Sequence, residues 1–417
     1  MNILYINHYA GSIEMGMEFR PYYIAKELLK YGHKVDIIAA DYSHLRSKNP
    51  NVINWEITNI DGIDYHWVHT KRYKGNGIKR AITMFQFVGA LKRNAKRIAL
   101  TLKPDVIITS STYPLDTYAG QKIKRIAQKR LNKKVLLIHE VHDMWPITPI
   151  ELYGMSPKNP FIIMLQKAEN SFCKHSDKVI SILPFAKDYL IEHGMGENNF
   201  CFVPNGIVLD DWDNKIDIPV ELKNVLSNAR QKEKFVLCFF GSHTRSYSLD
   251  YLIKAVKQLS DNKLFVIFVG DGVYKQELIR LCDEMNLNNQ VYFYDKINKK
   301  MIPGLLDYCD ATYVGAIKNQ MFRFGIGMNK LFDSMMGGKP ILYAVDAPNN
   351  YIKEYNCGVS VEAESVDDLV NGLKTLLEMS SDELAQMGRN GKEAVIQNFN
   401  YTVIGKEIDE IITGDIN

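Results

Sequence analysis

Residues 2–40 read NILYINHYAGSIEMGMEFRPYYIAKELLKYGHKVDIIAA and decide the class of the fold. The apolar run at 3–7 predicts a strand, and residues 18–31 predict a helix that ends at Gly32. A second strand is predicted at 34–40. A strand, a glycine-containing loop, a helix and another strand make the βαβ unit of a parallel sheet. The segment lacks G-x-G-x-x-G, so it carries no dinucleotide-binding fingerprint.

The same alternation returns in the second half of the chain. Residues 235–240 and 264–269 predict buried strands, and residues 249–259 predict the helix between them. Further strands are predicted at 291–294, 311–314 and 340–344. The sequence therefore predicts an α/β protein with two successive parallel-sheet lobes.

Chain length supports two domains, because 417 residues exceed what one ordinary core holds. The turn signal PNGI at 204–207 and the charged stretch 210–234 separate the two sheet-like regions. We place an N-terminal lobe at 1–205 and a second lobe at 206–385. A helical tail at 386–417 is expected to pack back toward the N-terminal lobe.

Composition narrows the class of protein and its compartment. The six cysteines are far apart and include no C-x-x-C, which argues against a zinc site or a disulfide framework and favours a reducing cytoplasm. No apolar run approaches the roughly 20 residues of a spanning helix. The N-terminus lacks the basic region of a signal peptide.

Basic residues concentrate between 71 and 103, although the net charge of the chain is only +3. This segment has no acidic residue, and its apolar centre at 82–91 is flanked by lysines and arginines. It predicts contact with an anionic membrane surface. The alternative is a helix packed on the first lobe with a solvated basic edge. Nucleic acid is the other polyanion to consider, but no recognisable binding module accompanies the cluster.

Residues 322–340 read FRFGIGMNKLFDSMMGGKP and predict a glycine loop that feeds a helix at 329–336. A helix N-terminus presents unpaired N–H groups and partial positive charge to a phosphate. Lys330 in the first turn can reach the same anion, and Asp333 on the same face can accept hydrogen bonds from ribose hydroxyls. The alternative interpretation is an ordinary capped helix.

Other candidates lie where predicted strands end. Gly241 and Ser242 would admit a phosphate to the backbone, with Arg245 as a bidentate clamp. Gly270 and Asp271 follow the next strand, where turn residues are an equally good interpretation. In the first lobe the concave site is bordered by Gly11, Gly16, Glu18 and Arg20, the last two of which could equally be a solvated helix start.

The segment HEVHDMWPITP at 139–149 follows another predicted strand. The spacing H-E-x-H-D differs from the H-E-x-x-H of a helical zinc site, so we expect no metal. Polar groups at a strand end need partners, and contact between Glu140 or His142 and a sugar hydroxyl is expected instead.

Several of these segments together resemble the retaining glycosyltransferases of family 4, which have the GT-B fold of two Rossmann-like lobes facing across a cleft. The resemblance spans essentially the whole chain. It is closest to WbuB-like transferases of O-antigen and capsule loci, which are associated with N-acetylfucosamine transfer. The segments that carry the resemblance are GHKV (32–35), HEVHDMWPITPIELYGMSP (139–157), SDKVISILPFAK (176–187), FVPNGI (202–207), FFGS (239–242), VGDG (269–272) and KLFDSMMGGKPI (330–341).

The resemblance implies roles for particular residues. His142 would contact the donor sugar and Asp143 would support it, with Lys330 and Arg245 stabilising the leaving diphosphate. The family usually has two glutamates eight positions apart, and this chain has Gly325 and Asp333 there. The role of the first glutamate is therefore vacant. Donor-binding residues are expected at Gly241, Ser242, Arg245, Gly270, Asp271, Asn329, Lys330, Leu331 and Asp333, and acceptor-binding residues at Gly11, Gly16, Glu18, Arg20 and Glu140.

The function implied is transfer of a sugar from a UDP-sugar to a polyprenyl-diphosphate-linked acceptor, with retention at the anomeric carbon. The enzyme is expected on the inner face of the bacterial cell membrane, without a cofactor, a metal or nucleic acid. A UDP-sugar epimerase of GT-B fold and a non-catalytic nucleotide-sugar-binding protein are the alternatives. An epimerase would need no acceptor, and a binding protein would show no transfer.

Overall fold

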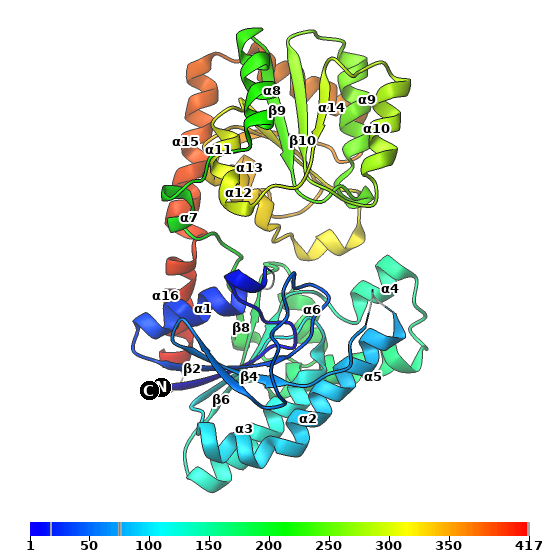
Figure 1. The fold of residues 1–417 in the computed structure, drawn as a ribbon. Helices are drawn as coiled ribbons and strands as arrows, with labels where there is room; N and C mark the ends of the chain where they lie inside the picture. The colour runs from blue at the N-terminus through cyan, green and yellow to red at the C-terminus, as the bar shows by residue number, and fades with distance from the viewer. Residues whose placement is uncertain (17–18, 74, 76, 415–417) are drawn as a thin grey trace. The chain divides into compact units, whose positions relative to one another are not determined.

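The computed structural model describes residues 1–16, 19–73, 75 and 77–414. The chain forms two compact units, one from residues 1–205 and 401–417 and the other from residues 206–400 (Figure 1). Glu18, an expected acceptor-binding residue, lies outside the described residues.

Unit 1 is built on an eight-stranded sheet in the order β3-β4-β2-β1-β5-β6-β7-β8. The first βαβ unit is confirmed, since β1 and β2 pair in parallel with Asn2 opposite Lys34. Within this sheet β3 runs antiparallel to β4, and the other paired strands are parallel. The strands are β1 (Asn2–Ile6), β2 (Lys34–Ala40), β3 (Ile57–Ile60), β4 (Ile63–Val68), β5 (Val106–Thr109), β6 (Leu136–Val141), β7 (Lys178–Ser181) and β8 (Phe200–Phe202).

Helices cover this sheet with apolar faces. The basic segment contains α2, whose buried side chains include Met84, Phe87 and Leu91 and join the core beneath β1 and β5. Lys103, in the left-handed region at φ 47°, ends α2 just before Pro104. The helices of unit 1 are α1 (Phe19–Lys30), α2 (Ile78–Leu102), α3 (Thr117–Leu131), α4 (Ile147–Tyr153), α5 (Pro160–His175), α6 (Lys187–Glu192) and α16 (Tyr401–Gly414), with 3-10 turns at Ile13–Met15, Pro114–Asp116 and Glu197–Asn199.

Unit 2 contains a six-stranded, wholly parallel sheet in the order β11-β10-β9-β12-β13-β14. One largely parallel and one wholly parallel sheet in the same chain confirm the predicted α/β fold of GT-B type. The strands are β9 (Phe235–Phe240), β10 (Leu264–Val269), β11 (Val291–Tyr294), β12 (Ala311–Gly315), β13 (Ile341–Ala344) and β14 (Gly358–Val361).

Helices of unit 2 cover both faces of its sheet (Figure 1). The helix predicted at 329–336 is α12, with those bounds. The helices are α7 (Asp210–Asp213), α8 (Val220–Gln231), α9 (Leu249–Leu259), α10 (Lys275–Glu284), α11 (Ile302–Leu306), α12 (Asn329–Met336), α13 (Tyr351–Glu354), α14 (Val366–Glu378) and α15 (Ser381–Asn398), with 3-10 turns at Arg245–Tyr247, Lys299–Met301 and Gln320–Phe324.

The C-terminal segment does not form the single tail expected at 386–417. Helix α15 packs on α12 within unit 2, where Gly388 admits the carbonyl of Gly338 so closely that a Cβ would collide with it. Helix α16 packs on α1 in unit 1, with Gly405 against Glu27. Small residues therefore fix each helix to a different unit.

No helix among the described residues is long and apolar enough to cross a bilayer.

Candidate functional site

Lys330 and the end of β9 meet in unit 2. Gly241 follows β9 with φ 135°, and a Cβ there would stand 2.8 Å from the Lys330 Nζ atom. Only glycine suits both that φ and that contact. The structure thus brings together two residues predicted from separate segments, 89 positions apart in the chain.

The Lys330 ammonium is buried without a hydrogen-bond acceptor among the described residues. Its Nζ atom lies 3.2 Å from the ring centroid of Tyr247 and 4.3 Å from that of Phe239. Removal from water lowers the pKa of Lys330 to about 7. A buried donor with no acceptor is costly, so this ammonium is ready to pair with an incoming anion.

The loop before α12 explains the missing carboxylate. Gly325 has φ 90° and ψ −178°, a backbone region that essentially only glycine adopts. The side chain of Asn349 then fixes the next residue, accepting from Ile326 N and donating to Ile326 O, both at 2.8 Å. Glutamate at position 325 would therefore strain the loop. Met328 precedes the helix without a side-chain cap, and Leu331 N donates to the Met328 carbonyl at 3.0 Å, so the N–H groups that can face an anion are those of the first two residues of α12.

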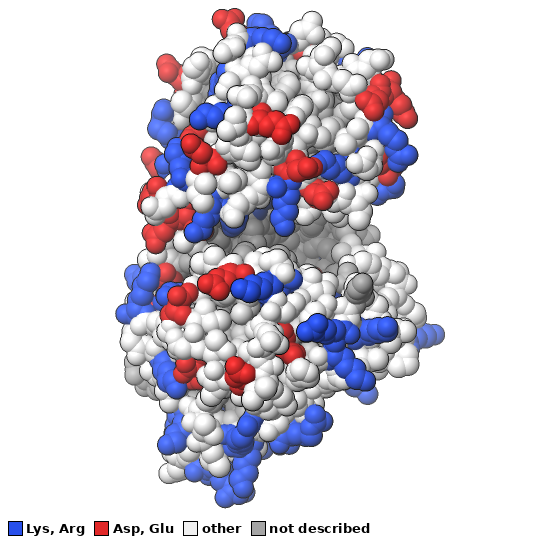
Figure 2. Space-filling view, in the orientation of Figure 1, with Lys and Arg blue, Asp and Glu red and all other residues white. Residues whose placement is uncertain are grey.

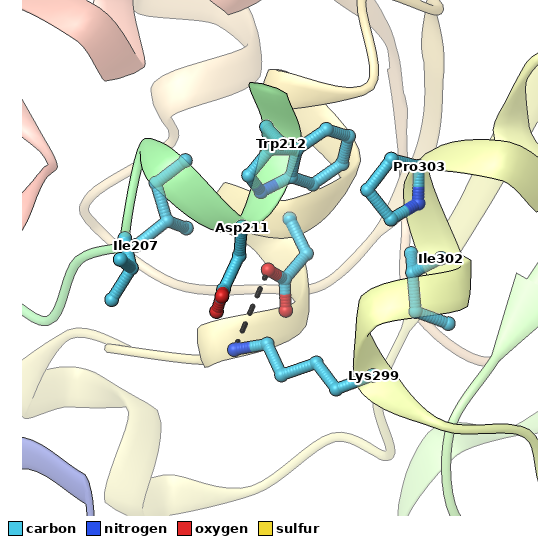
Figure 3. Close-up of a pocket in the computed structure, with 8 residues that line it drawn as sticks. Ile207, Asp211, Trp212, Lys299, Ile302 and Pro303 are labelled. Atoms are coloured by element: carbon cyan, nitrogen blue, oxygen red, sulfur yellow. Dashed lines mark ion pairs between the residues drawn. The ribbon is translucent and has the colours of Figure 1, made fainter. Parts of the chain in front are cut away.

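Asp333 lies one turn after Lys330 and lines a narrow pocket whose water-accessible volume is only about 10 Å³. Its carboxylate is 3.6 Å from the Lys299 Nζ atom. Burial raises the pKa of Asp333, while Lys299 opposes that rise. Figure 3 shows Trp212 and Pro303 beside the pocket, and its dashed line marks the ion pair between Lys299 and Asp333. Trp212, Lys299 and Pro303 were missed by the sequence analysis, because no motif marks them.

Arg245 forms an ion pair with Glu277. Its guanidinium is 74% exposed and contacts both oxygens of Glu277, at 2.9 and 3.0 Å. It also lies 5.0 Å from the ring centroid of Tyr274. Both Glu277 contacts come from the single nitrogen Nη2, so Arg245 makes an exposed ion pair with Glu277 rather than the two-nitrogen clamp predicted for a phosphate.

Of the remaining residues expected at the donor site, some have backbone or core roles and two are exposed. Gly270, with φ 153°, is packed so tightly that a Cβ would collide with the carbonyl of Gly241. The Asp271 carbonyl accepts from His243 N at 2.8 Å. Leu331 is fully buried in the core, whereas Ser242 and Asn329 are exposed.

His243, which the sequence analysis did not select, is fully buried there. Neither of its ring nitrogens has a hydrogen-bond partner among the described residues. Burial, together with the charge of Lys275, lowers the pKa of His243 to about 4.

In unit 1, Glu140 is the centre of a buried polar network at the end of β6. Its carboxylate, 0% exposed, accepts from the Arg20 Nε atom at 2.9 Å and the Ser110 hydroxyl at 2.6 Å. It also contacts the Tyr5 hydroxyl and lies 3.1 Å from His142 Nε2. Burial by itself raises the pKa of this carboxyl, but Arg20 and His142 more than compensate and hold it well below the usual range.

The acceptor role expected for Glu140 is therefore corrected, because its oxygens already serve Arg20, Tyr5 and Ser110. Arg20, only 6% exposed, also donates to the carbonyls of Val203 and Pro204. The Arg20 side chain is therefore buried and holds the loop after β8, and it is not solvated at the start of a helix.

His142 and Asp143 do not form the expected pair. His142 Nε2 lies 2.8 Å from the Ser110 hydroxyl and 3.1 Å from Glu140, so Glu140 supports the imidazole. Asp143 instead accepts from Met144 N, Trp145 Nε1 and the Thr148 hydroxyl and shapes the loop that leads into α4. The Asp143 carboxyl thereby stabilises its own loop.

The glycine loop after β1 is held by nearby side chains. Tyr65 donates its hydroxyl to the carbonyl of Gly11 at 2.7 Å. Gly16 has φ 82°, and a Cβ there would collide with the Ser47 hydroxyl. His139, the other histidine of the segment after β6, stacks on Phe172 at 3.8 Å and is a core residue. No group of three or more potential metal-ligating side chains occurs in the part of the chain that the structure describes.

Both halves of the chain match glycosyltransferase family models. Residues 15–211 match the model described as Glycosyltransferase Family 4, and residues 223–394 match the one described as Glycosyl transferases group 1.

Curated relatives match about half of this chain. A putative colanic acid biosynthesis glycosyl transferase, WcaI of Escherichia coli, is 26% identical over 218 residues, covering 50% of this chain and 51% of that protein. N-acetylgalactosamine-N,N'-diacetylbacillosaminyl-diphospho-undecaprenol 4-alpha-N-acetylgalactosaminyltransferase of Campylobacter jejuni is 23% identical over 247 residues, covering 57% of this chain and 63% of that protein. The chain thus spans about half to under two thirds of the length of these relatives.

A solved structure shares the whole fold. Anabaena Alr3699/HepE, solved in complex with UDP and glucose, superimposes with a TM-score of 0.67 at 17% identity, covering 99% of each chain.

Proposed function

We propose that this chain, which consists of a family 4 and a group 1 glycosyltransferase domain, transfers a sugar from a UDP-sugar to a polyprenyl-diphosphate-linked acceptor. The single observation that carries the proposal is the buried Lys330 ammonium, which finds no acceptor among the residues the structure describes and faces Gly241 at the start of α12. That combination suits a diphosphate, because a fixed cation and open backbone N–H groups converge there.

The pocket at Asp333 supplies the rest of a nucleotide site. Its carboxylate suits two ribose hydroxyls, and the apolar walls of Trp212, Ile302 and Pro303 suit the flat face of a base. Asp333 and Lys330 lie three positions apart on one helix, so ribose and diphosphate would be held by adjacent turns. The complex of the structural relative HepE with UDP is consistent with this choice of nucleotide.

In the proposed reaction the bond between the anomeric carbon and the diphosphate oxygen breaks, and UDP leaves with the electron pair. The acceptor hydroxyl forms the new glycosidic bond and gives its proton to the departing diphosphate, with retention of configuration. Negative charge grows on the leaving diphosphate, where Lys330 and the α12 N-terminus would stabilise it without a metal. His142, held by the anionic Glu140, would contact the donor sugar.

The acceptor and the location are proposed from several supports. The Campylobacter relative is named for a diphospho-undecaprenol-linked substrate. The basic helix α2 exposes Ile78, Ile82 and Phe85, which suits a protein bound peripherally to the inner face of the cell membrane. A deoxy, N-acetylated hexosamine such as N-acetylfucosamine is proposed as the donor sugar, in O-antigen or capsule synthesis.

The test uses the whole chain with a panel of UDP-sugars. We expect one donor to raise the melting temperature and then to be transferred to a polyprenyl-diphosphate saccharide, with activity retained in EDTA. Lys330→Met should weaken donor binding by roughly 10- to 150-fold, while Lys392→Met, an exposed lysine of α15, should leave it unchanged. Conversion of the donor to an isomer without acceptor, or binding without transfer or hydrolysis, would contradict the proposal.

A further inference from the structure

Arg20 is a buried cation in unit 1 with contacts on two sides. Figure 2 shows many Lys and Arg side chains on the surface, where water solvates them, but the Arg20 side chain is only 6% exposed. Its Nε atom donates to Glu140 Oε1 at 2.9 Å. Its Nη2 atom donates to the Val203 carbonyl at 3.0 Å, and Nη1 donates to the Pro204 carbonyl at 2.5 Å and to Asn205 Oδ1 at 3.3 Å. Each of the three guanidinium nitrogens is held by an acceptor, so the plane of the guanidinium is fixed.

Three of these acceptors lie where the chain leaves unit 1. The chain passes into unit 2 after Asn205 and returns to unit 1 after Asn400. Just beyond the first crossing, Ile207 N donates to the Phe399 carbonyl at 3.0 Å, and Ile207 pairs with Asn400 in a parallel bridge. The outgoing segment and the returning segment are thus hydrogen-bonded to each other. A displacement of either segment therefore reaches the acceptors of the guanidinium.

The returning segment also approaches Arg20 through α16. The Tyr401 ring lies 4.8 Å from the ring of Tyr23, on the next turn of α1 after Arg20. Burial raises the pKa of Glu407 on α16, and the positive charge of Arg20 opposes that rise. The guanidinium thus lies within electrostatic reach of α16 as well as within hydrogen-bond reach of the loop after β8.

On its other side, Arg20 is linked to His142 through Glu140. Arg20 holds Oε1 of the Glu140 carboxylate. Oε2 of the same carboxylate lies 3.1 Å from His142 Nε2 and 2.6 Å from the Ser110 hydroxyl. That hydroxyl is in turn 2.8 Å from His142 Nε2. Because a carboxylate is planar, a rotation that follows the guanidinium at Oε1 also moves Oε2 and changes the contacts that orient the imidazole.

Neutralisation of Glu140 does not account for all of the Arg20 contacts. A lysine would supply the charge, because one cation neutralises one carboxylate. The bonds to the two carbonyls and to the Asn205 amide bring no charge to Glu140, and they require the planar fork of an arginine. The fork of Arg20 therefore links the loop after β8 to the carboxylate that contacts His142.

We propose that Arg20 is a positioning residue that makes the orientation of His142 depend on the two segments by which the chain passes between the units. This inference rests on the proposed function, in which His142 contacts the donor sugar. His142 is correctly placed only while residues 203–205 and the start of α16 keep the arrangement that Arg20 holds. In the proposed function Lys330 binds the donor diphosphate in unit 2, so the loss of this arrangement should lower turnover and leave UDP affinity unchanged.

The test uses the full chain and two substitutions. Arg20→Lys keeps a positive charge beside Glu140 and loses the planar fork, and Asn205→Ala removes one acceptor of the fork. Arg230→Lys is the matched control, because Arg230 of unit 2 also joins a carboxylate, at 2.8 Å, to a backbone carbonyl, at 3.1 Å. Thermal melting checks that each variant folds, and Asn205→Ala, the milder change, decides alone where Arg20→Lys does not fold.

The first readout is the ring nitrogen resonances of His142 in the free protein, measured by NMR and assigned with His142→Gln. Asn205→Ala should shift these resonances, because the loss of one acceptor lets the guanidinium turn, and Arg230→Lys should leave them in place. The shift should vanish when Asn205→Ala is added to Arg20→Lys, which has already broken the link. Unchanged His142 resonances in Asn205→Ala would overturn the proposal, as would a shift that persists without the arginine.

The second readout is turnover. Arg20→Lys should lower kcat roughly tenfold, the equivalent of one net hydrogen bond, and leave the Kd of UDP unchanged. In a His142→Gln background the same substitution should have no further effect, because the two residues act in series. Equal losses in both backgrounds would mean that Arg20 acts independently of His142 and would refute the coupling. If the wild type transfers no sugar, the proposed function fails, and the His142 resonances still decide the coupling.

Discussion

Replacement of Lys330 by methionine gives the sharpest test of the donor site, because no described residue accepts a hydrogen bond from this buried ammonium. Methionine keeps much of the length and apolar character of the chain over Tyr247 and Phe239 and removes only the charge. If the Lys330 ammonium binds the diphosphate, the variant should bind UDP more weakly. It should also lose a pH dependence that the wild type shows.

The magnitude follows from the pKa of Lys330. Burial places it at about 7, whereas free lysine titrates near about 10.4, so charging this group costs roughly 5 kcal/mol. At a pH of about 8 the free protein holds a neutral lysine in about nine of ten molecules. A bound diphosphate favours the charged form and raises the pKa, so binding takes up a proton. UDP affinity should therefore fall about tenfold for each pH unit above about 7.

Isothermal titration calorimetry with UDP measures this linkage, in two buffers of different ionisation enthalpy. Uridine, which has no phosphate, is the control ligand and should bind without pH dependence. Lys330→Met should weaken UDP binding by roughly 10- to 150-fold at a pH of about 7, the loss of one charge-assisted hydrogen bond. Equal pH slopes for UDP and uridine, or a wild-type slope that survives in Lys330→Met, would refute the assignment.

The same substitution has a consequence for stability. The pKa of Lys330 is lower in the folded than in the unfolded protein. The free energy of unfolding therefore increases as the pH rises from about 7 toward about 10, because the unfolded protein then binds more protons than the folded one. Urea unfolding should find Lys330→Met more stable than wild type near pH values of about 6. That advantage should shrink as the pH rises. A constant difference would mean that the ammonium is solvated.

Three further substitutions test the remaining groups. Glu140→Ala leaves the buried Arg20 charge without its partner and should lower the free energy of unfolding by about 3–5 kcal/mol, measured in urea. Asp333→Ala should weaken UDP and uridine equally, by roughly 10- to 150-fold, without changing inhibition by pyrophosphate; a selective loss of pyrophosphate inhibition would contradict the ribose assignment. Burial raises the pKa of Glu169 to about 8, above its unfolded value, so wild type loses stability as the pH rises from about 5 to about 8. Glu169→Gln should remove that loss, and parallel pH profiles would show that Glu169 is ionised throughout.

Local patterns were sufficient to predict most elements. The strand predicted at 235–240 and the helix at 329–336 have those bounds as β9 and α12. Both contain apolar residues at the spacing of their element and are bounded by residues that end a strand or a helix. Such signals depend only on neighbouring residues. The motif around Lys330 was also visible, because a glycine loop before a short helix is a local arrangement.

The sequence alone did not show which residue each charged side chain contacts. Arg245 had the chemistry of a phosphate clamp, yet it pairs with Glu277, 32 positions away. Glu140 seemed suited to a sugar, yet it neutralises Arg20 across 120 positions. Nothing local distinguishes a carboxylate that meets a substrate from one that meets a buried arginine. Only the packing of distant segments decides which of the two it meets.

By itself, the sequence determined that this protein is a repeated α/β chain with a candidate phosphate-binding helix at 329–336. The hydrophobic periods of strands and helices, and the glycines that end them, depend only on residues close together in the chain. The tertiary structure decided what surrounds Lys330 and position 325. Aromatic rings brought from other segments strip water from the Lys330 ammonium and leave it without an acceptor. The backbone at Gly325 takes a conformation closed to glutamate. Both outcomes depend on desolvation and on dihedral angles that the whole fold sets, and the neighbouring residues in the sequence do not predict either of them.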